Sequence, residues 1–242
     1  MRSYPEITWF GFDRRDGTLL FYNFVNSVCN PEKVLLDFGA GRAEFFENDP
    51  CKFRVGARVL KTKVKKVIAV DVDTAVFQNS TVDEAYVLDK DGRIPLPDSS
   101  VDIVLADWVF EHLCDPQLTA AEFHRILRPS GIVCARTPNK YGYIALGANI
   151  IPKSLHDAVL GLLQPSRKSI DVFPKYYQAN TVSDLKRAFP TEQFDLLTFC
   201  MDASPSYTGK DGFFFQAFAF LQSCTPSPFK SVRLVFARKR TV

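Results

Sequence analysis

The chain has 242 residues, of which 46% are hydrophobic and 24% are charged, so it is long enough to bury one sizeable core. We therefore interpret it as a single domain spanning residues 1–242. The formal net charge of +3 and the isoelectric point near 8.5 are too mild to predict a nucleic-acid or membrane partner, because such partners usually require a concentrated basic surface.

The six cysteines lie far apart, form no CxxC pair and sit mostly within apolar runs, so they predict neither a zinc site nor a disulfide framework. The first residues, MRSYPEITWFGFDRRDG, have no continuous apolar stretch after a basic start, which argues against a secretory signal. The longest apolar run, residues 213–221, is about half as long as a bilayer span requires. We expect a cytoplasmic protein without a membrane span.

Short apolar runs with polar turns after them dominate the first half of the sequence. Runs without strict alternation are typical of strands buried on both faces, as in a parallel sheet covered by helices. Four of them come before a helix, and a fifth follows it. The predicted strands cover residues 34–38, 67–70, 85–88, 101–106 and 132–136.

A helix is predicted over residues 116–128, with Asp115 as its N-cap and Pro116 at its first position. Pro129-Ser130-Gly131 should end it. Strand, helix and strand at this spacing imply a right-handed crossover and hence a doubly wound α/β sheet.

The second half of the chain is less regular. Residues 141–180 are rich in aromatics and loop formers, and a segment of this length is more often a functional cap than a passive connector. A capping box, Thr181 with Asp184, precedes a predicted helix over residues 182–189. Strands are predicted at 194–200 and 231–237. The Phe-rich run 213–221 could form a core helix, a dimer face or a membrane contact, and we interpret it as core.

The stretch VLLDFGAGRAEFF begins as a strand and breaks at Gly39 and Gly41, where the ligand crevice of an open α/β sheet lies. A dinucleotide site would have glycine at position 44, but Glu44 there would repel a pyrophosphate. Asp37 adds a second acid, which suits a cationic ligand. Asp71, at the end of the second strand, could accept both hydroxyls of a ribose. A ribose and a cation without phosphate describe S-adenosylmethionine.

The serial pattern VLLDFGAG (34–41), VIAVDVD (67–73), LDKDGRIPLPDSSVDIVLADWVFEHLCDP (88–116) and EFHRILRPSGIVCARTPN (122–139) resembles the class I S-adenosylmethionine-dependent methyltransferases. It is most similar to the methyltransferase type 11-like subgroup of small-molecule, quinone and glycan enzymes. The resemblance covers residues 33–140, the expected cofactor-binding core. It implies a Rossmann-like, mostly parallel seven-stranded sheet with a cap inserted over the acceptor at 141–180.

The resemblance also implies roles for single residues. Ala43 and Ser130 stand where many members of the family have glycine, so we expect altered loop geometry there. The implied cofactor contacts are Gly39 and Gly41 to the methionine portion, Asp37 to the ammonium side, Asp71 to the ribose hydroxyls, Val72 beside the adenine, Asp89 to the adenine amine, and Ala106 and Asp107 near the sulfonium.

Methyl transfer from a sulfonium mainly requires alignment and a dry pocket, but a hydroxyl acceptor also needs a base. His112, just after the fourth strand, is the best placed of the three histidines, although Glu111 and His112 could instead hold the loop. Asn139, after the fifth strand, could orient the acceptor or be an ordinary turn residue. The histidine and cysteine spacing predicts no metal site.

For other side chains near the cap, both a role in acceptor binding and a purely structural role are possible interpretations. Tyrosine and phenylalanine side chains there could stack on an acceptor ring or serve packing. Basic side chains could hold an acidic group on the acceptor, but solvation explains each of them better, and it also explains the basic segment 52–66 better than an anionic partner does. The aromatics are Tyr141, Tyr143, Phe173, Tyr176 and Tyr177, and the basic residues are Arg136, Lys140, Arg167 and Lys168.

The leading hypothesis is an S-adenosylmethionine-dependent methyltransferase that acts on oxygen or nitrogen of a small-molecule or glycan-type acceptor. The alternative is a non-catalytic regulatory or partner subunit that keeps the same fold. A nicotinamide-dependent oxidoreductase is disfavoured by Glu44. No motif in residues 140–230 specifies the acceptor, and none specifies the oligomeric state.

Overall fold

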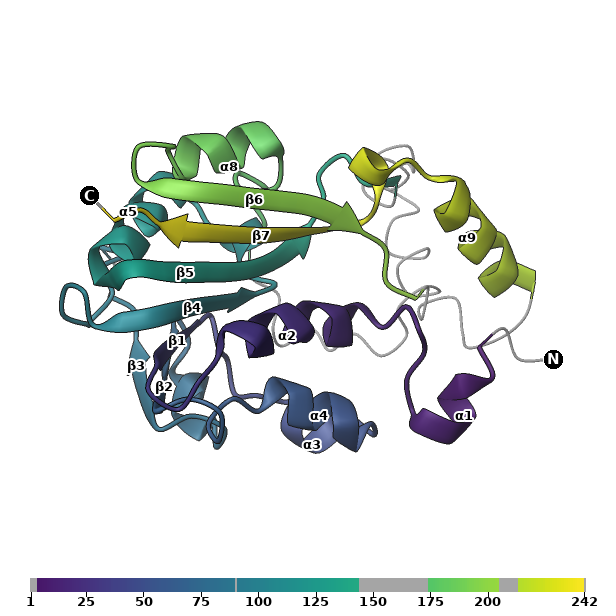
Figure 1. Cartoon of the computed structure of the whole chain (residues 1–242), viewed down its shortest axis with the longest axis horizontal. Coiled ribbons are helices and arrows are strands. Elements are labelled where there is room, and N and C mark those ends of the chain that lie inside the picture. Colours follow the sequence, from purple (N-terminus) through teal and green to yellow (C-terminus); the bar gives the residue numbers. More distant parts are fainter. Residues whose placement is uncertain (1–3, 90, 144–173, 205–212, 242) are drawn as a thin grey trace.

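The computed structural model describes residues 4–89, 91–143, 174–204 and 213–241 (Figure 1). Short 3₁₀ helices lie at Thr74–Gln78, Phe110–His112 and Ser227–Phe229. The longer elements are α1 (Glu6–Phe10), α2 (Gly17–Val28), β1 (Val34–Phe38), α3 (Phe45–Asn48), α4 (Lys52–Arg58), β2 (Lys66–Asp71), β3 (Glu84–Val87), β4 (Val101–Asp107), α5 (Pro116–Ile126), β5 (Leu127–Pro138), α8 (Val182–Ala188), β6 (Phe194–Met201), α9 (Phe213–Cys224) and β7 (Val232–Lys239).

The strands form one seven-stranded sheet in the order β3-β2-β1-β4-β5-β7-β6. Strands β1 to β5 are parallel, and β7 is antiparallel to both of its neighbours, so β6 again runs with the majority. The predicted doubly wound, mostly parallel sheet is confirmed. The carboxyl ends of β1, β2 and β4 therefore meet at one edge, where such sheets bind their ligands.

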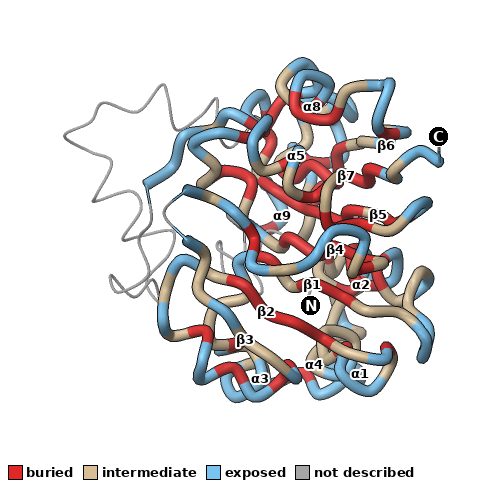
Figure 2. The backbone as a smooth tube through the Cα atoms, turned by 90° about the vertical axis from the view of Figure 1, so that its left-hand side faces the viewer, coloured by how far each residue is buried: buried red, intermediate tan, exposed pale blue. Residues whose placement is uncertain are grey.

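Each face of the sheet carries its own hydrophobic core. Strand residues pack against α2 on one face, where Phe21 and Val25 are fully buried, and against α5 and α8 on the other, where Phe123 and Leu185 are. Figure 2 shows the strands as the most continuously buried part of the chain. Burial on both faces explains why the strands read as continuous apolar runs.

The sequence signals for α5 and α8 are confirmed. The side chain of Asp115 accepts a hydrogen bond from the backbone N–H of Leu118 at 3.0 Å, and Pro116 occupies the first turn. Thr181 and Asp184 form the predicted capping box. Helix α5 ends at Ile126, two residues early, because Leu127 already pairs with Val101 as part of β5.

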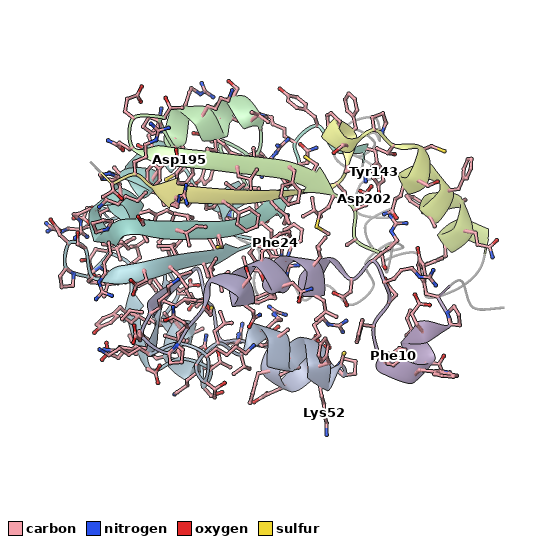
Figure 3. The ribbon with its side chains drawn as sticks, viewed as in Figure 1. Phe10, Phe24, Lys52, Tyr143, Asp195 and Asp202 are labelled. Atoms are coloured by element: carbon pink, nitrogen blue, oxygen red, sulfur yellow. The ribbon has the colours of Figure 1, made fainter. Side chains whose placement is uncertain are left out.

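The interpretation of the Phe-rich run as core is wrong. It forms α9, which lies beyond the ends of the strands β6 and β7 (Figure 1). Of its described side chains, Phe215 and Gln222 are buried, whereas Phe220 is 71% exposed. Gln222 anchors the helix by donating to the hydroxyl of Tyr143 at 2.9 Å and to the carbonyl of Ala203 at 3.0 Å, in the region of Asp202 and Tyr143 in Figure 3.

The basic segment 52–66 is largely a surface feature. Lys61 and Lys66 form ion pairs with Asp83 and Glu84, and Lys52 extends from α4 into solvent (Figure 3). Most of the predicted cap, including His156, Arg167, Lys168 and Phe173, lies outside the described residues. Within the part of the chain that the structure describes, no helix has the length and apolarity needed to cross a bilayer.

Candidate functional site

A cavity of about 780 Å³ opens at the carboxyl ends of β1, β2 and β4, a size typical of small-molecule sites. Residues far apart in the sequence meet there, because the strand order brings the second, first and fourth strands side by side. The predicted residues that line the cavity are Asp37, Gly39, Gly41, Asp71, Val72, Asp107 and His112, and Tyr176 from the end of the predicted cap joins them.

The glycine turn after β1 has the backbone conformation that glycine favours. Gly39 has a φ of 74° and Gly41 a φ of 53°. A Cβ atom on Gly39 would lie 2.4 Å from a methyl carbon of Val109, whereas one on Gly41 would meet nothing within 4 Å. Gly39 is therefore required for packing as well as for conformation, and Gly41 for conformation alone.

Ala43 and Ser130, the two departures from the family pattern, also lie in the left-handed region, with φ values of 57° and 63°. Both residues adopt a backbone conformation that glycine would adopt without strain, and the expectation of altered loop geometry stays a prediction. Ala43 is buried beneath the ligand turn, and the Ser130 hydroxyl lies 3.0 Å from that of Thr241.

Asp71 is oriented by backbone donors. Its Oδ2 accepts a hydrogen bond from the N–H of Gly41 at 2.8 Å, and its Oδ1 accepts one from the N–H of Asp73 at 2.9 Å. Each carboxylate oxygen can accept a further bond. The residue thus fixes the glycine turn while keeping the capacity to bind a pair of hydroxyls, as a ribose presents them.

Asp37 lies in the cavity wall with its carboxylate unpaired. No hydrogen bond or ion pair engages this carboxylate among the described residues. Burial, and after it the charge of Asp107, raises the pKa of Asp37 to about 7, while Arg58 acts in the opposite direction. A partly buried, unpartnered acid of this kind is suited to a ligand that brings its own positive charge.

Asp107 lines the cavity, but its carboxylate is already occupied. Arg136 bonds to it through both Nε and Nη2, the latter at 2.9 Å, and Tyr22 donates its hydroxyl at 3.1 Å. Arg136 is only 5% exposed, so the expectation of a solvated or acceptor-binding side chain is wrong. The guanidinium is buried because Asp107 and the hydroxyl of Thr18, at 3.0 Å, satisfy its donors.

Two predicted cofactor contacts do not line the cavity. Ala106 is fully buried in the hydrophobic core and is not among the residues that line the cavity. Asp89 is exposed, and Asp91 takes its place in the wall. The prediction that Ala106 lines the pocket is wrong, and the adenine contact of Asp89 stays a prediction.

Asn139 does not have the role predicted for it. Its amide nitrogen donates to the carbonyls of Pro228 and Lys230, both at 2.8 Å. Its Oδ1 accepts from Arg233 at 3.2 Å and from the N–H of Tyr141 at 3.3 Å. The side chain is 1% exposed and ties the end of β5 to the segment before β7, so no group remains to orient an acceptor.

His112 and Glu111 hold the segment 174–177 against the cavity. The backbone carbonyl of Glu111 accepts hydrogen bonds from the N–H groups of Tyr176 and Tyr177, at 2.8 and 3.2 Å. His112 Nδ1 lies 2.8 Å from the carbonyl oxygen of Pro174. Because a carbonyl only accepts, Nδ1 carries the hydrogen, which leaves Nε2 as the basic atom of the neutral ring.

The predicted catalytic role of His112 stays a prediction. Its Nε2 lies 4.0 Å from a carboxylate oxygen of Glu111, whose other oxygen accepts from Thr137 at 3.0 Å. Burial raises the pKa of Glu111. The two residues therefore have the loop-holding role already, and the ring remains in the cavity wall.

Sequence reasoning missed Tyr22, Arg58 and Trp108, which also line the cavity. Tyr22 comes from α2 and Arg58 from α4, where its guanidinium packs over Phe45 at 3.8 Å. Neither had a signal of its own, because both are ordinary helix residues until the helices pack. Trp108 did have one: it follows Asp107 at the end of a strand that points to the ligand edge.

The fold and the site have the features expected of a class I S-adenosylmethionine-dependent methyltransferase domain. Residues 36–135 match the methyltransferase domain family. The residues present fit the cofactor of that class. The carboxylate of Asp37 has no partner among the described residues, and the carboxylate of Asp71, which bonds to the glycine turn, is oriented to accept hydrogen bonds from hydroxyls.

Curated relatives agree over the same region. A probable S-adenosylmethionine-dependent methyltransferase of Mycobacterium tuberculosis is 39% identical over 93 residues, which is 37% of this chain and 34% of the relative. A malonyl-[acyl-carrier protein] O-methyltransferase of Yersinia pestis is 32% identical over 107 residues, 43% of this chain and 36% of the relative. The chain thus spans about a third of the length of the curated relatives it matches.

Solved structures extend the likeness in fold to nearly the whole chain. A putative methyltransferase from Haloferax volcanii, in complex with the Trm112 activator, has a TM-score of 0.55 at 16% identity, covering 94% of this chain and 91% of that one. The [4+2]-cyclase SpnF has a TM-score of 0.54 at 15% identity, covering 93% and 82%. Identities this low support the fold alone.

Proposed function

We propose that the chain is an enzyme that transfers a methyl group from S-adenosylmethionine to oxygen or nitrogen of a small-molecule or glycan-type acceptor. The observation that carries the proposal is the pairing, in one cavity, of an unpartnered Asp37 with an oriented Asp71 across the glycine turn. S-adenosylmethionine differs most from a dinucleotide in its ammonium group and its unphosphorylated ribose. These two acids are suited to bind those two groups.

Asp37 would hold the cofactor ammonium, and Asp71 the ribose hydroxyls. Val72, whose side chain is exposed in the cavity wall, would flank the adenine. When bound, the cofactor supplies a methyl group on a positively charged sulfur. The chain itself supplies position and an apolar surrounding, since Leu113, Leu118 and Tyr176 are among the residues that line the cavity.

His112 is the base in this proposal. Its Nε2, left basic because Nδ1 donates to Pro174, would take the proton that an acceptor hydroxyl loses as its oxygen gains the methyl group. An amine acceptor that arrives neutral would use the same atom after transfer. An oxygen acceptor is favoured by the likeness to an O-methyltransferase, and either a small molecule or a glycan would meet the requirement.

A second function has an observation in its favour. The fold is shared with a [4+2]-cyclase, and one fold can serve unrelated chemistries. A chain that binds the cofactor without transferring its methyl group, as a regulatory or partner subunit, would have the same cavity.

The test separates these functions. The protein is incubated with S-adenosylmethionine labelled in its methyl group and with fractionated host metabolites, and mass spectrometry identifies any labelled product. A labelled product that disappears in Asp71→Ala supports the enzyme. Cofactor binding with no labelled product in any fraction supports the non-catalytic function.

A further inference from the structure

Trp108 has a backbone conformation that bulky residues rarely adopt. Its φ of 62° lies in the left-handed region, directly after the last residue of β4. Its N–H donates to the carbonyl of Arg136 at 3.0 Å, which holds the residue in place. The side chain lines the cavity and is 40% exposed. A strained residue in a cavity wall is a common mark of function.

One face of the indole ring is covered. The guanidinium carbon of Arg136 lies 5.2 Å from the ring centre of Trp108, and the same group also contacts the rings of Phe21 and Tyr22, at 5.3 and 6.0 Å. Asp107 neutralises this guanidinium, so the indole rests on an ion pair and not on an isolated cation. The exposed part of the ring is therefore its other face and its edge.

The surroundings of the ring suit a cation. Asp37 and Asp71 line the same cavity, and Asp37 has no partner among the described residues. The proposed cofactor has two cationic groups. Its ammonium can donate hydrogen bonds to Asp37, but its sulfonium has no hydrogen to donate. An aromatic face attracts such a cation through its quadrupole, and tryptophan does so most strongly.

We propose that Trp108 recognises the positive charge of the sulfonium and so discriminates S-adenosylmethionine from S-adenosylhomocysteine, in which that sulfur is neutral. This inference rests on the proposed function. It gives the strained residue a role in turnover, because the attraction is present for the methyl donor and absent for the product.

A packing role alone does not explain Trp108. Packing aromatics in this fold, such as Phe21 and Phe123, are fully buried, and Phe21 lies on a regular helix. Trp108 combines 40% exposure with a left-handed backbone, so the fold adopts a costly conformation for a side chain that it buries only in part.

The test compares the affinities of both compounds by calorimetry. Wild-type protein, Trp108→Leu and Trp108→Phe are each titrated with S-adenosylmethionine and with S-adenosylhomocysteine. We expect Trp108→Leu to lower the ratio of the two affinities by about threefold to tenfold, and Trp108→Phe to lower it less because a ring remains. Val72→Ala is the matched control: it shortens an apolar side chain that we place beside the adenine, which both compounds share, so it should weaken both alike and leave their ratio unchanged.

Fluorescence gives a readout that does not depend on the affinities. The chain has two tryptophans, so Trp9→Phe leaves Trp108 as the sole tryptophan, whose emission is selected by excitation at a wavelength that tyrosine does not absorb. Trp9 is 84% exposed on α1 and is not among the cavity residues. We expect Trp108 emission to change more at saturation with S-adenosylmethionine than at saturation with S-adenosylhomocysteine.

The outcomes are distinguishable. An affinity ratio that stays the same in Trp108→Leu, or equal weakening for both compounds, overturns the inference while leaving the proposed function in place. Wild-type protein that binds neither compound contradicts the proposed function itself. Thermal unfolding of each variant, with a transition near that of the wild type, confirms that the comparison is between folded proteins.

Discussion

Asp107 and Arg136 are register partners on the neighbouring parallel strands β4 and β5, and their side chains form a buried two-point ion pair behind the cavity wall. The pair also carries Trp108, whose N–H donates to the Arg136 carbonyl and whose ring lies over the guanidinium. One contact between two strands thus supports the part of the wall that we assign to the sulfonium.

Removing one partner of this pair should be costly. Arg136→Met leaves Asp107 with the hydroxyl of Tyr22 and a longer contact to Arg58, whose Nη2 lies 3.8 Å from its Oδ2, so we expect the free energy of unfolding to fall by about 3 kcal/mol. Chemical denaturation measures it. The double variant Arg136→Met with Asp107→Asn should recover part of the loss, because no buried charge is then left unpaired. If the double variant were no more stable than Arg136→Met, the charge of Asp107 would not be the cause of the lost stability.

Asp37 should oppose folding and favour cofactor binding. Its pKa is raised from 3.8 to about 7, so its contribution to stability is fully present below about pH 4 and is lost as pH rises through about 7. Asp37→Asn has no such loss. We expect the variant to gain on the order of 1 kcal/mol in free energy of unfolding relative to wild type between about pH 5 and about pH 8.

The same variant should bind the cofactor less tightly. Its affinity for S-adenosylmethionine should fall at least about tenfold at neutral pH, because the ammonium loses its charged partner. Calorimetry and denaturation on the two proteins across that pH range check both halves of the prediction. A variant that is less stable than wild type at about pH 8 would count against the raised pKa.

The two glycines of the ligand turn should differ in their tolerance of alanine. Gly39→Ala places a methyl group 2.4 Å from Val109 and should cost several kcal/mol or prevent folding, whereas Gly41→Ala meets only the strain of its φ, about 1 kcal/mol. Denaturation curves for both, with Gly39→Ala repeated on Val109→Ala, test this. The second substitution should restore part of the stability that Gly39→Ala loses, and no recovery would mean that the clash is not the cause.

His112→Asn separates the two roles of this residue. Asparagine keeps a donor that can reach the Pro174 carbonyl but has no basic nitrogen. We expect cofactor affinity within about twofold of wild type, and methyl transfer to a hydroxyl acceptor lower by a factor of about 100 to 10,000. Unchanged transfer would leave only the loop-holding role.

Local signals predicted much of this molecule. The strands could be predicted because most of them are buried on both faces. Helix α5 could be predicted because its N-cap Asp115 and Pro116 in its first turn are local signals. The ligand turn could be predicted for the same reason, since Asp37, Gly39 and Gly41 lie within five residues of the sequence and line the same cavity.

Contacts between distant parts of the chain could not be predicted from the sequence. In the sequence alone Arg136 resembles a solvent-exposed cation, because only the register of β5 on β4 shows that it lies opposite Asp107. Asn139 reads as a turn residue because its partners, Pro228 and Lys230, lie some 90 residues away. The apolar sequence of α9 predicted burial, but the helix lies beyond the ends of the strands, where Phe220 and Leu221 are exposed among the described residues.

The most direct measurement is a calorimetric titration of S-adenosylmethionine and of NAD into wild-type protein and into Asp71→Ala. Asp71 alone links the glycine turn to the expected ribose hydroxyls, through bonds to Gly41 and Asp73. We predict one site for S-adenosylmethionine, weakened at least about tenfold in Asp71→Ala, and no binding of NAD. Wild-type protein that binds NAD, or that does not bind S-adenosylmethionine, would contradict the account.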